Sequence, residues 1–328
     1  IAVNGNMHVT NGTMNIGLAT TDITVDGETL VNGDVILSAT PALAAGSLTI
    51  GGAGVQNFKL NAANGIDIRG NINATQGDFS RTAQFVAGNN IINVGGDVSA
   101  AGGGSLIFGN STANTTTIAG DATANGTGTL EFYGNQTTVG SLSGTGKIVS
   151  HGGQITATNG DINIANTIWF NNPTTDPASG LIVKDANNLT LATQIGDITA
   201  AGIDLAAGNT LNLTSARNVI IDGTVTDSGT LNITSAQNTT LTRDITVASG
   251  TGSLNIDAAS INMADLTNNN IAKLVATNIS AGALNAAGGL MSISGDLLTA
   301  NLLTVSSGAT ATIDVGTTVI SGPVAVTG

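Results

Sequence analysis

Apolar and polar residues alternate along most of this chain with a period of two. Thr, Val and Ile dominate the alternating stretches, and Gly or Asn interrupts them repeatedly. A period of two places successive side chains on opposite faces of a β-strand, whereas an amphipathic helix repeats its apolar residues at every third or fourth position. The pattern therefore predicts a string of short strands, with a short helical turn expected only at residues 264–276.

The predicted strands recur at a nearly constant interval. Residues 210–218, TLNLTSARN, return twenty residues later as TLNITSAQN, and the dipeptide Gly-Asp recurs at intervals near twenty or a multiple of twenty. Four strands that begin with the pattern Leu-x-apolar are separated by 22, 20 and 23 residues: Leu189, Leu211, Leu231 and Leu254. A period of this length is typical of stacked structural repeats.

These observations predict an all-β fold, a right-handed parallel β-helix (β-solenoid) with about 20–23 residues per rung. We expect one continuous solenoid over residues 1–328, in which each strand pairs with its copy one rung away at about 4.8 Å. The narrow interior favours aliphatic side chains, and large aromatic rings are expected to be rare inside it, in line with an aromatic content of 2%.

The abundant Asn residues suit both the turns and the stacking. Amides that lie one above another at the rung spacing can hydrogen-bond to each other, and Asn also stabilises tight turns. The candidates for such turns and ladders are Asn71, Asn73, Asn89, Asn90, Asn218, Asn238 and Asn268 to Asn270.

One stretch interrupts the regular pattern. Residues 169–180, WFNNPTTDPASG, contain the single Trp and two of the four prolines. We interpret them as a loop that protrudes from the solenoid and forms a candidate recognition element, because exposed aromatic side chains on a stiff loop offer contact area at low entropic cost. The residues concerned are Trp169, Phe170, Pro173 and Pro177. The alternative is that Trp169 and Phe170 cover an apolar flank of the solenoid.

The composition narrows the range of functions. Charged residues make up 9% of the chain, against roughly 25% in an average soluble protein, and the net charge is −13. The eight Lys and Arg residues are scattered, so nucleic acid and anionic membrane surfaces are disfavoured as partners. No apolar run approaches the roughly 18 residues of a membrane span, and we expect no membrane insertion of this segment. The absence of Cys is typical of bacterial proteins that pass through an oxidising compartment.

The sequence offers little for catalysis. Glycoside cleavage needs two carboxyl groups at a defined separation, but Glu28 and Glu131 are the only Glu residues and lie far apart. The Asp residues occur mainly in turn contexts. The adjacent pairs Lys184-Asp185 and Arg243-Asp244 are interpreted as solvated surface pairs. We therefore expect a protein that is not an enzyme, with no catalytic residues and no cofactor.

Metal binding has weak support as well. His8 and His151 are far apart and have no local partner at ligand spacing, which favours surface or turn positions for both. We expect no metal site, although calcium between stacked carboxylates stays an open alternative if the rungs that carry Asp78, Asp97 and Asp121 adjoin.

Two segments carry a family resemblance. Residues 125–148, NGTGTLEFYGNQTTVGSLSGTGKI, resemble autotransporter passenger repeats, including those of rickettsial outer membrane protein B. Residues 208–223, GNTLNLTSARNVIIDG, are similar to the repeats of filamentous-haemagglutinin-type exoproteins. The resemblance implies a secreted β-solenoid surface protein of a Gram-negative bacterium that serves in adhesion, surface coating or fibre formation, and these families share no active-site motif.

Three functions follow as hypotheses. The first is a non-enzymatic extracellular or cell-surface structural protein or adhesin, a rigid β-solenoid rod whose partner is a host or neighbouring cell surface. The alternative is a self-assembling subunit of an extracellular fibre or surface layer, whose partner is the chain itself. The second alternative is a β-helix that binds or cleaves polysaccharide.

Overall fold

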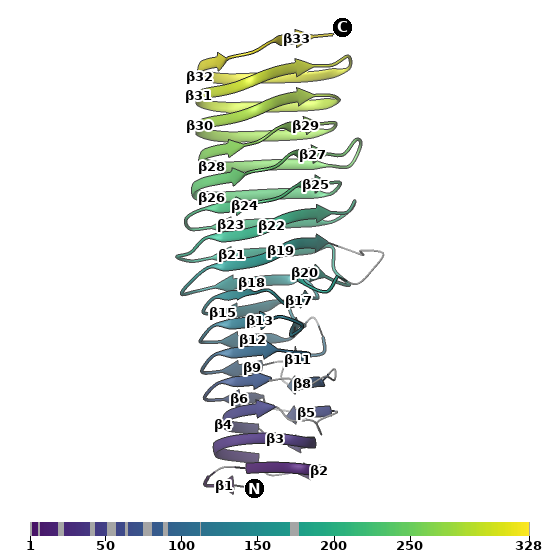
Figure 1. The fold of residues 1–328 in the computed structure, drawn as a ribbon, viewed down its shortest axis with the longest axis vertical. Coiled ribbons are helices and arrows are strands. Elements are labelled where there is room, and N and C mark those ends of the chain that lie inside the picture. Colours follow the sequence, from purple (N-terminus) through teal and green to yellow (C-terminus); the bar gives the residue numbers. More distant parts are fainter. Residues whose placement is uncertain are drawn as a thin grey trace. The chain divides into compact units, whose positions relative to one another are not determined.

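The protein is an all-β solenoid. The computed structural model describes residues 2–5, 7–18, 23–39, 43–50, 57–62, 65–74, 81–87, 91–111, 113–170 and 177–327. Within these ranges the regular elements are strands without any helix, and the strands stack in parallel coils (Figure 1). The predicted fold class is therefore confirmed. The short helical turn expected at residues 264–276 is wrong, because these residues form β29 (Leu266–Asn268) and the beginning of β30 (Ile271–Ala286).

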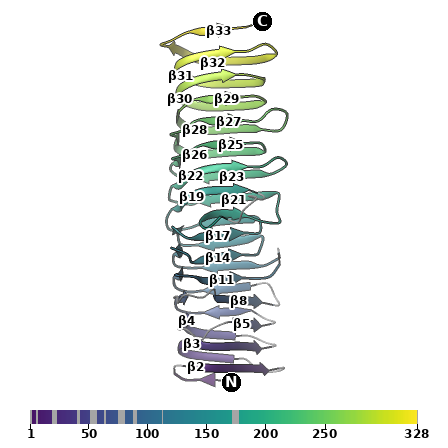
Figure 2. The same cartoon turned by 45° about the vertical axis from the view of Figure 1, so that its right-hand side comes forward.

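The chain divides into two compact units. The first unit comprises Ile1–Asn159 and Pro177–Lys184, and the second comprises Gly160–Asp176 and Asp185–Gly328. Each unit is a β-solenoid in its own right, with strands of successive coils side by side (Figures 1 and 2). That residues 1–328 form one continuous solenoid stays a prediction.

The strands of the first unit are β1 (Ala2–Val3), β2 (Met7–Leu18), β3 (Ile23–Ala39), β4 (Leu43–Ile50), β5 (Asn57–Ala62), β6 (Ile66–Ile68), β7 (Ile72–Ala74), β8 (Arg81–Ala87), β9 (Ile91–Val94), β10 (Val98–Ala101), β11 (Gly104–Phe108), β12 (Thr115–Ile118), β13 (Ala122–Asn125), β14 (Thr129–Phe132), β15 (Gln136–Val139), β16 (Leu142–Gly144), β17 (Lys147–Ser150), β18 (Gly153–Ala157) and β20 (Gly180–Val183).

The strands of the second unit are β19 (Ile162–Phe170), β21 (Asn188–Thr193), β22 (Ile198–Leu205), β23 (Thr210–Ser215), β24 (Val219–Ile221), β25 (Val225–Asp227), β26 (Thr230–Leu241), β27 (Ile245–Val247), β28 (Ser253–Met263), β29, β30, β31 (Gly289–Val305), β32 (Ala309–Ile320) and β33 (Val324–Val326).

Three columns of parallel strands build the best-described coils of the first unit. They run β7–β10–β13, β8–β11–β14–β17 and β9–β12–β15–β18, so that every third strand is a neighbour. In-register residues are separated by 18 positions from Thr129 to Lys147 and by 26 from Ile72 to Val98. The predicted 20–23 residues lie within this range, and coil length varies because the turns differ in length while the strand registers are kept.

The second unit shows directly what the sequence repeat means. Leu189, Leu211, Leu231 and Leu254 occupy the same register position on β21, β23, β26 and β28. All four side chains are fully buried. The repeated segments at 210–215 and 230–235 are therefore a strand and its hydrogen-bonded neighbour in the next coil, and the period of the sequence is the length of one coil.

Aromatic rings enter the core of the first unit, contrary to expectation. Phe85, Phe108 and Phe132 share one register position and are fully buried. Their ring centroids are 5.0 and 5.5 Å apart, with interplanar angles of 8° and 19°. The spacing of parallel strands, about 4.8 Å, is close to the stacking distance of flat rings. A column of identical rings therefore fits where a single ring against an aliphatic neighbour would not.

The recurring Gly-Asp dipeptide has a structural cause. The Asn71 side-chain oxygen accepts the backbone N–H of Asp97 at 2.8 Å, and the Asp97 carboxylate accepts the backbone N–H of Asp121 in the next coil at 2.9 Å. The accepting oxygen also passes over the residue before each Asp. A Cβ atom on Gly120 would overlap the Asp97 carboxylate oxygen. Gly therefore precedes Asp because the turn of the neighbouring coil leaves no room for a side chain.

Candidate binding groove of the second unit

A ladder of side-chain amides runs along the outer face of the second unit. Asn212, Asn232 and Asn255 share one register position on β23, β26 and β28, between buried positions that face the core. Asn255 Nδ2 donates to Asn232 Oδ1 at 2.8 Å, and Asn232 Nδ2 donates to Asn212 Oδ1 at 2.8 Å. Asn212 Nδ2 donates in turn to the Thr190 hydroxyl at 3.2 Å. All the amide dipoles of this ladder therefore point in the same direction.

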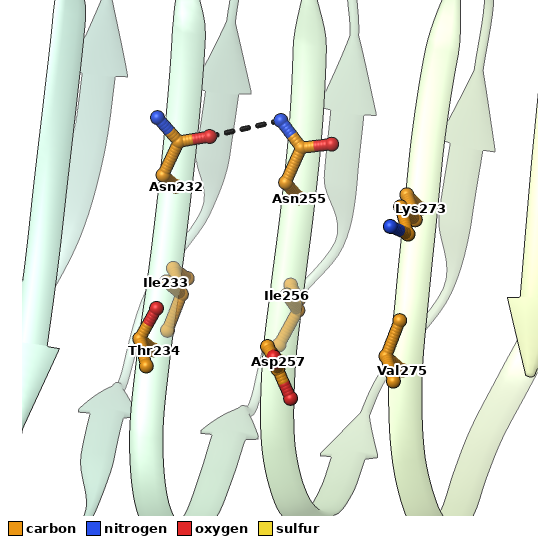
Figure 3. Close-up of a pocket in the computed structure, with 8 residues that line it drawn as sticks. All are labelled: Asn232, Ile233, Thr234, Asn255, Ile256, Asp257, Lys273 and Val275. Atoms are coloured by element: carbon orange, nitrogen blue, oxygen red, sulfur yellow. Dashed lines mark hydrogen bonds between the residues drawn. The ribbon is translucent and has the colours of Figure 1, made fainter. Parts of the chain in front are cut away.

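The ladder ends at a charged residue. Lys273 on β30 occupies the register position that follows Asn255, where the repeat would place another amide. Figure 3 shows the two Asn side chains joined by their hydrogen bond and Lys273 on the next strand. Asn255 Oδ1 is the last oxygen of the ladder and accepts no hydrogen bond from the described part of the chain. A neutral ladder thus terminates in an open acceptor beside a cation.

A second row of outward-facing side chains lies two residues further along the same strands. It consists of Thr234, Asp257 and Val275, again in register. Between the two rows lies a groove of about 300 Å³ (Figure 3). Its lining residues are Asn232, Ile233, Thr234, Asn255, Ile256, Asp257, Lys273 and Val275.

The two charges of the groove do not neutralise each other. Lys273 and Asp257 are both exposed, on neighbouring strands. Neither forms an ion pair within 4.0 Å among the residues that the structure describes. The groove therefore presents a free ammonium donor, a free carboxylate acceptor and an open amide oxygen within three adjacent coils. Such a set can hydrogen-bond a ligand that offers both donors and acceptors.

A second polar cluster lies in the first unit, around His151. The residue follows the end of β17, as a turn position requires, but its side chain is only 6% exposed and has a partner, which corrects the expectation of an isolated His. His151 Nε2 lies 2.8 Å from Glu131 Oε1, and the His151 ring stacks on Tyr133 with centroids 3.6 Å apart. The hydrogen bond from His151 lowers the pKa of the Glu131 carboxyl from its ordinary 4.5, although burial opposes the shift.

Sequence reasoning missed this cluster although the signal was present. Glu131 and His151 are twenty residues apart, which is one coil, so a local search for partners cannot find the pair. Their strands are neighbours, because Phe132 on β14 pairs with Ser150 on β17. His8, the other His residue, is exposed.

The candidate recognition residues at 169–180 have different fates. Phe170 is the last residue of β19 and is 2% exposed in the core, so the expectation of an exposed aromatic pair is wrong for this residue. The cause is strand alternation: Ile168 and Phe170 point inward, and Trp169 between them points outward and is half-buried. Pro177 is half-buried. Pro173 lies outside the described residues, and a recognition role for Trp169 and Pro177 stays a prediction.

The positions considered for turns, ladders and calcium are partly described. Asn218 Oδ1 accepts from both the backbone N–H and the side chain of Asn238, at 3.2 and 3.0 Å, so this predicted ladder is confirmed. Asp97 and Asp121 do adjoin, but the Asp97 carboxylate already accepts a backbone N–H. Asn89, Asn90 and Asp78 lie outside the described residues. In the part that the structure describes, no group of three His, Cys, Asp or Glu residues could hold a metal ion, and no helix is long and apolar enough to span a membrane.

The fold and the groove define a class: this chain is a repeat protein of the β-solenoid type, with a polar groove on the outer face of its second unit. The chain matches no protein-family model, and comparisons with curated proteins and with solved structures gave no match either.

Proposed function

We propose that this chain is a non-enzymatic structural protein of the extracellular space or cell surface of a Gram-negative bacterium. It acts as an adhesin, a stiff β-solenoid scaffold that contacts a host or neighbouring cell through its outer face. The observation that carries the proposal is the continuous coil-to-coil hydrogen bonding, in which neutral side chains on the outer face repeat the pairing of the backbone.

The pairing is most extensive in the second unit. β30 pairs with β31 at thirteen positions, from Ile271–Leu290 to Ala286–Val305, and β26 pairs with β28 at ten. Each coil therefore satisfies the backbone groups of the next, and opening one coil exposes many of them at once. A chain of this kind is expected to resist proteolysis and to keep its shape under load.

The neutral outer face supports the same proposal. Hydrogen bonds between uncharged amides, such as those that join Asn212, Asn232 and Asn255, are not screened by salt, whereas exposed ion pairs weaken as ionic strength rises. A scaffold held by such bonds suits an exterior whose salt concentration changes. The resemblance of residues 125–148 and 208–223 to secreted surface repeats points to the same location.

Antibodies raised against the folded chain provide the test. We expect them to label intact cells that produce the protein, and brief external protease treatment should remove flexible neighbours before it removes this chain. We also expect cells that lack the gene to attach less well to their target surface, with attachment restored by the wild-type gene. Labelling that appears only after permeabilisation would overturn the location, and unchanged attachment would overturn the adhesin role.

The competing functions have their own readouts. Long uniform filaments of the purified chain in electron micrographs would support the fibre subunit instead. Release of reducing ends or unsaturated products from a polysaccharide panel would replace the scaffold with an enzyme.

A further inference from the structure

We propose that the groove over β26, β28 and β30 binds a short neutral oligosaccharide. This inference deepens the proposed function, because it names the chemistry that the outer face of an adhesin would recognise. It rests on the amide ladder, the two unpaired charges and the shape of the groove.

The ladder makes Asn255 Oδ1 a strong acceptor. Asn255 donates to Asn232, which donates to Asn212, so the amide dipoles align and polarise one another along the column. The negative end of this column is Asn255 Oδ1, and no described residue donates to it. The hydroxyl group of a sugar is a suitable donor for this oxygen.

The charges of the groove match hydroxyl groups better than they match another charge. Lys273 supplies N–H donors and no acceptor, whereas the Asp257 carboxylate supplies acceptors and no donor. A hydroxyl group both donates and accepts, so a sugar with neighbouring hydroxyls can satisfy Lys273, Asp257 and Asn255 Oδ1 together. Hydrogen bonds to charged groups are about twice as strong as those between neutral groups.

The same charges argue against an acidic sugar. A carboxylate placed beside Lys273 would also approach Asp257 on the neighbouring strand, where like charges repel. The net charge of the chain, −13, adds repulsion at longer range. We therefore assign the groove to neutral sugars, and acidic sugars form the comparison in the test.

The shape of the groove sets the size of the ligand and the strength of binding. A volume of about 300 Å³ is at the lower end of small-molecule sites, which suggests that one or two sugar rings fit. Val275 provides an apolar wall for the C–H face of a ring, but no aromatic side chain lines the groove. We expect weak binding to one groove, strengthened when many copies of the chain on one surface meet many sugars.

The experiment measures binding of four tetrasaccharides to the full chain by saturation-transfer NMR titration. Cellotetraose, chitotetraose and β-1,4-mannotetraose are the neutral probes, and tetragalacturonate is the acidic probe. The groove variants are Lys273→Gln and Asp257→Asn. The matched controls are Arg243→Gln and Asp244→Asn, which make the same charge changes at exposed positions of the same unit outside the groove.

We expect at least one neutral tetrasaccharide to bind saturably and more tightly than tetragalacturonate. Each groove variant should weaken that binding by about tenfold or more, because each removes a charged hydrogen-bonding partner, and the two controls should leave it unchanged. All four substituted positions are exposed, and circular dichroism and thermal unfolding verify that every variant is folded.

Three results would overturn the inference. They are the absence of saturable binding by any neutral probe, equal affinities of the groove variants and the wild-type chain, and a preference for tetragalacturonate. These results leave the cell-surface labelling untouched, so the groove can fail while the proposed function stands. Conversely, sugar binding by a chain that is found only inside cells would overturn the proposed function and keep the groove.

Discussion

A single buried carboxyl group, Asp227, gives the second unit a measurable dependence on pH. Asp227 is the last residue of β25 and occupies a core position between Leu205 and Val247 of the adjoining coils. It is 0% exposed. One carboxylate oxygen accepts the backbone N–H of Gly229 at 3.0 Å, and the other has no hydrogen-bond partner. Burial raises the pKa of Asp227 from its ordinary 3.8 to about 7, despite the hydrogen bonds from the backbone N–H groups of Gly229 and Ser253.

The shift determines the sign and the size of the effect. Between pH 4 and pH 7 the folded chain holds a proton on Asp227 that the unfolded chain has released, so the free energy of unfolding falls as pH rises through this window. A difference of about three pKa units corresponds to about 4 kcal/mol at pH 8. The substitution Asp227→Asn keeps the shape and the bond from Gly229 but cannot ionise. We expect the variant to match the wild-type chain near pH 4 and to be more stable by about 2 to 4 kcal/mol at pH 8.

Urea unfolding followed by circular dichroism at pH 4.5, 6 and 8 tests this expectation. The quantity of interest is the difference between variant and wild type at each pH, because other titrating groups cancel in it. Asp204→Asn serves as the control, since Asp204 lies on the same coil at an exposed outer position and its replacement should give no pH-dependent difference. Parallel pH profiles for Asp227→Asn and the wild-type chain would refute the reasoning. A ¹³C NMR titration that places the Asp227 carboxyl near its ordinary pKa would refute it independently.

Three further substitutions test the packing of the first unit. Gly120→Ala should lower the stability by about 1 to 3 kcal/mol, because the added methyl group overlaps the neighbouring turn; Gly5→Ala, with open space around it, should have a smaller effect in the same thermal melt. Phe108→Ala should cost about 3 to 5 kcal/mol by opening a cavity in the ring stack, and an unchanged melting temperature would contradict the stacking. Glu131→Gln should cost about 1 kcal/mol at pH 7 by weakening the bond to His151. Because the pKa of Glu131 is lowered, its contribution is present above pH 4.5 and is lost as pH falls below that value, so the difference from wild type should vanish in acid urea melts.

The sequence was sufficient to predict the fold because the fold depends on a repeat. A coil length near twenty residues and a side-chain period of two determine which residues pair and which face the core, as the register of Leu211 with Leu231 illustrates. The Phe stack was not predicted because composition counts rings without locating them. Three rings separated by about one coil each form a column, but an interior thought too narrow for one ring hides that relation.

The candidate groove could be predicted only in part. The equal spacing of Asn212 and Asn232 predicts that their amides stack, but the position of Lys273 beside Asn255 depends on a coil that is shorter than its neighbours. Ser253 pairs with Ile271, a separation of 18 residues, whereas Thr230 pairs with Ser253 at 23. Such changes arise in the turns, whose length the strand pattern does not fix. The His151–Glu131 pair was missed for the same reason, because the register across turns brought the two residues together.

The scarcity of charge in this chain follows from the stacking itself. A charged side chain on the outer face has the next coil as its nearest neighbour, and a repeat would place the same charge there, about 4.8 Å away, where like charges repel. Neutral amides and hydroxyls avoid this cost and gain hydrogen bonds, so they fill the columns. A charge can therefore occur on the face only where a column changes its character. Lys273 ends the column of Asn232 and Asn255, and Glu131 stands between Ile107 and Val149. In a solenoid of this composition, positions at which a neutral column is interrupted by a charge are where binding sites should be sought first, and the groove beside Lys273 is the described site that combines such an interruption with a concave surface.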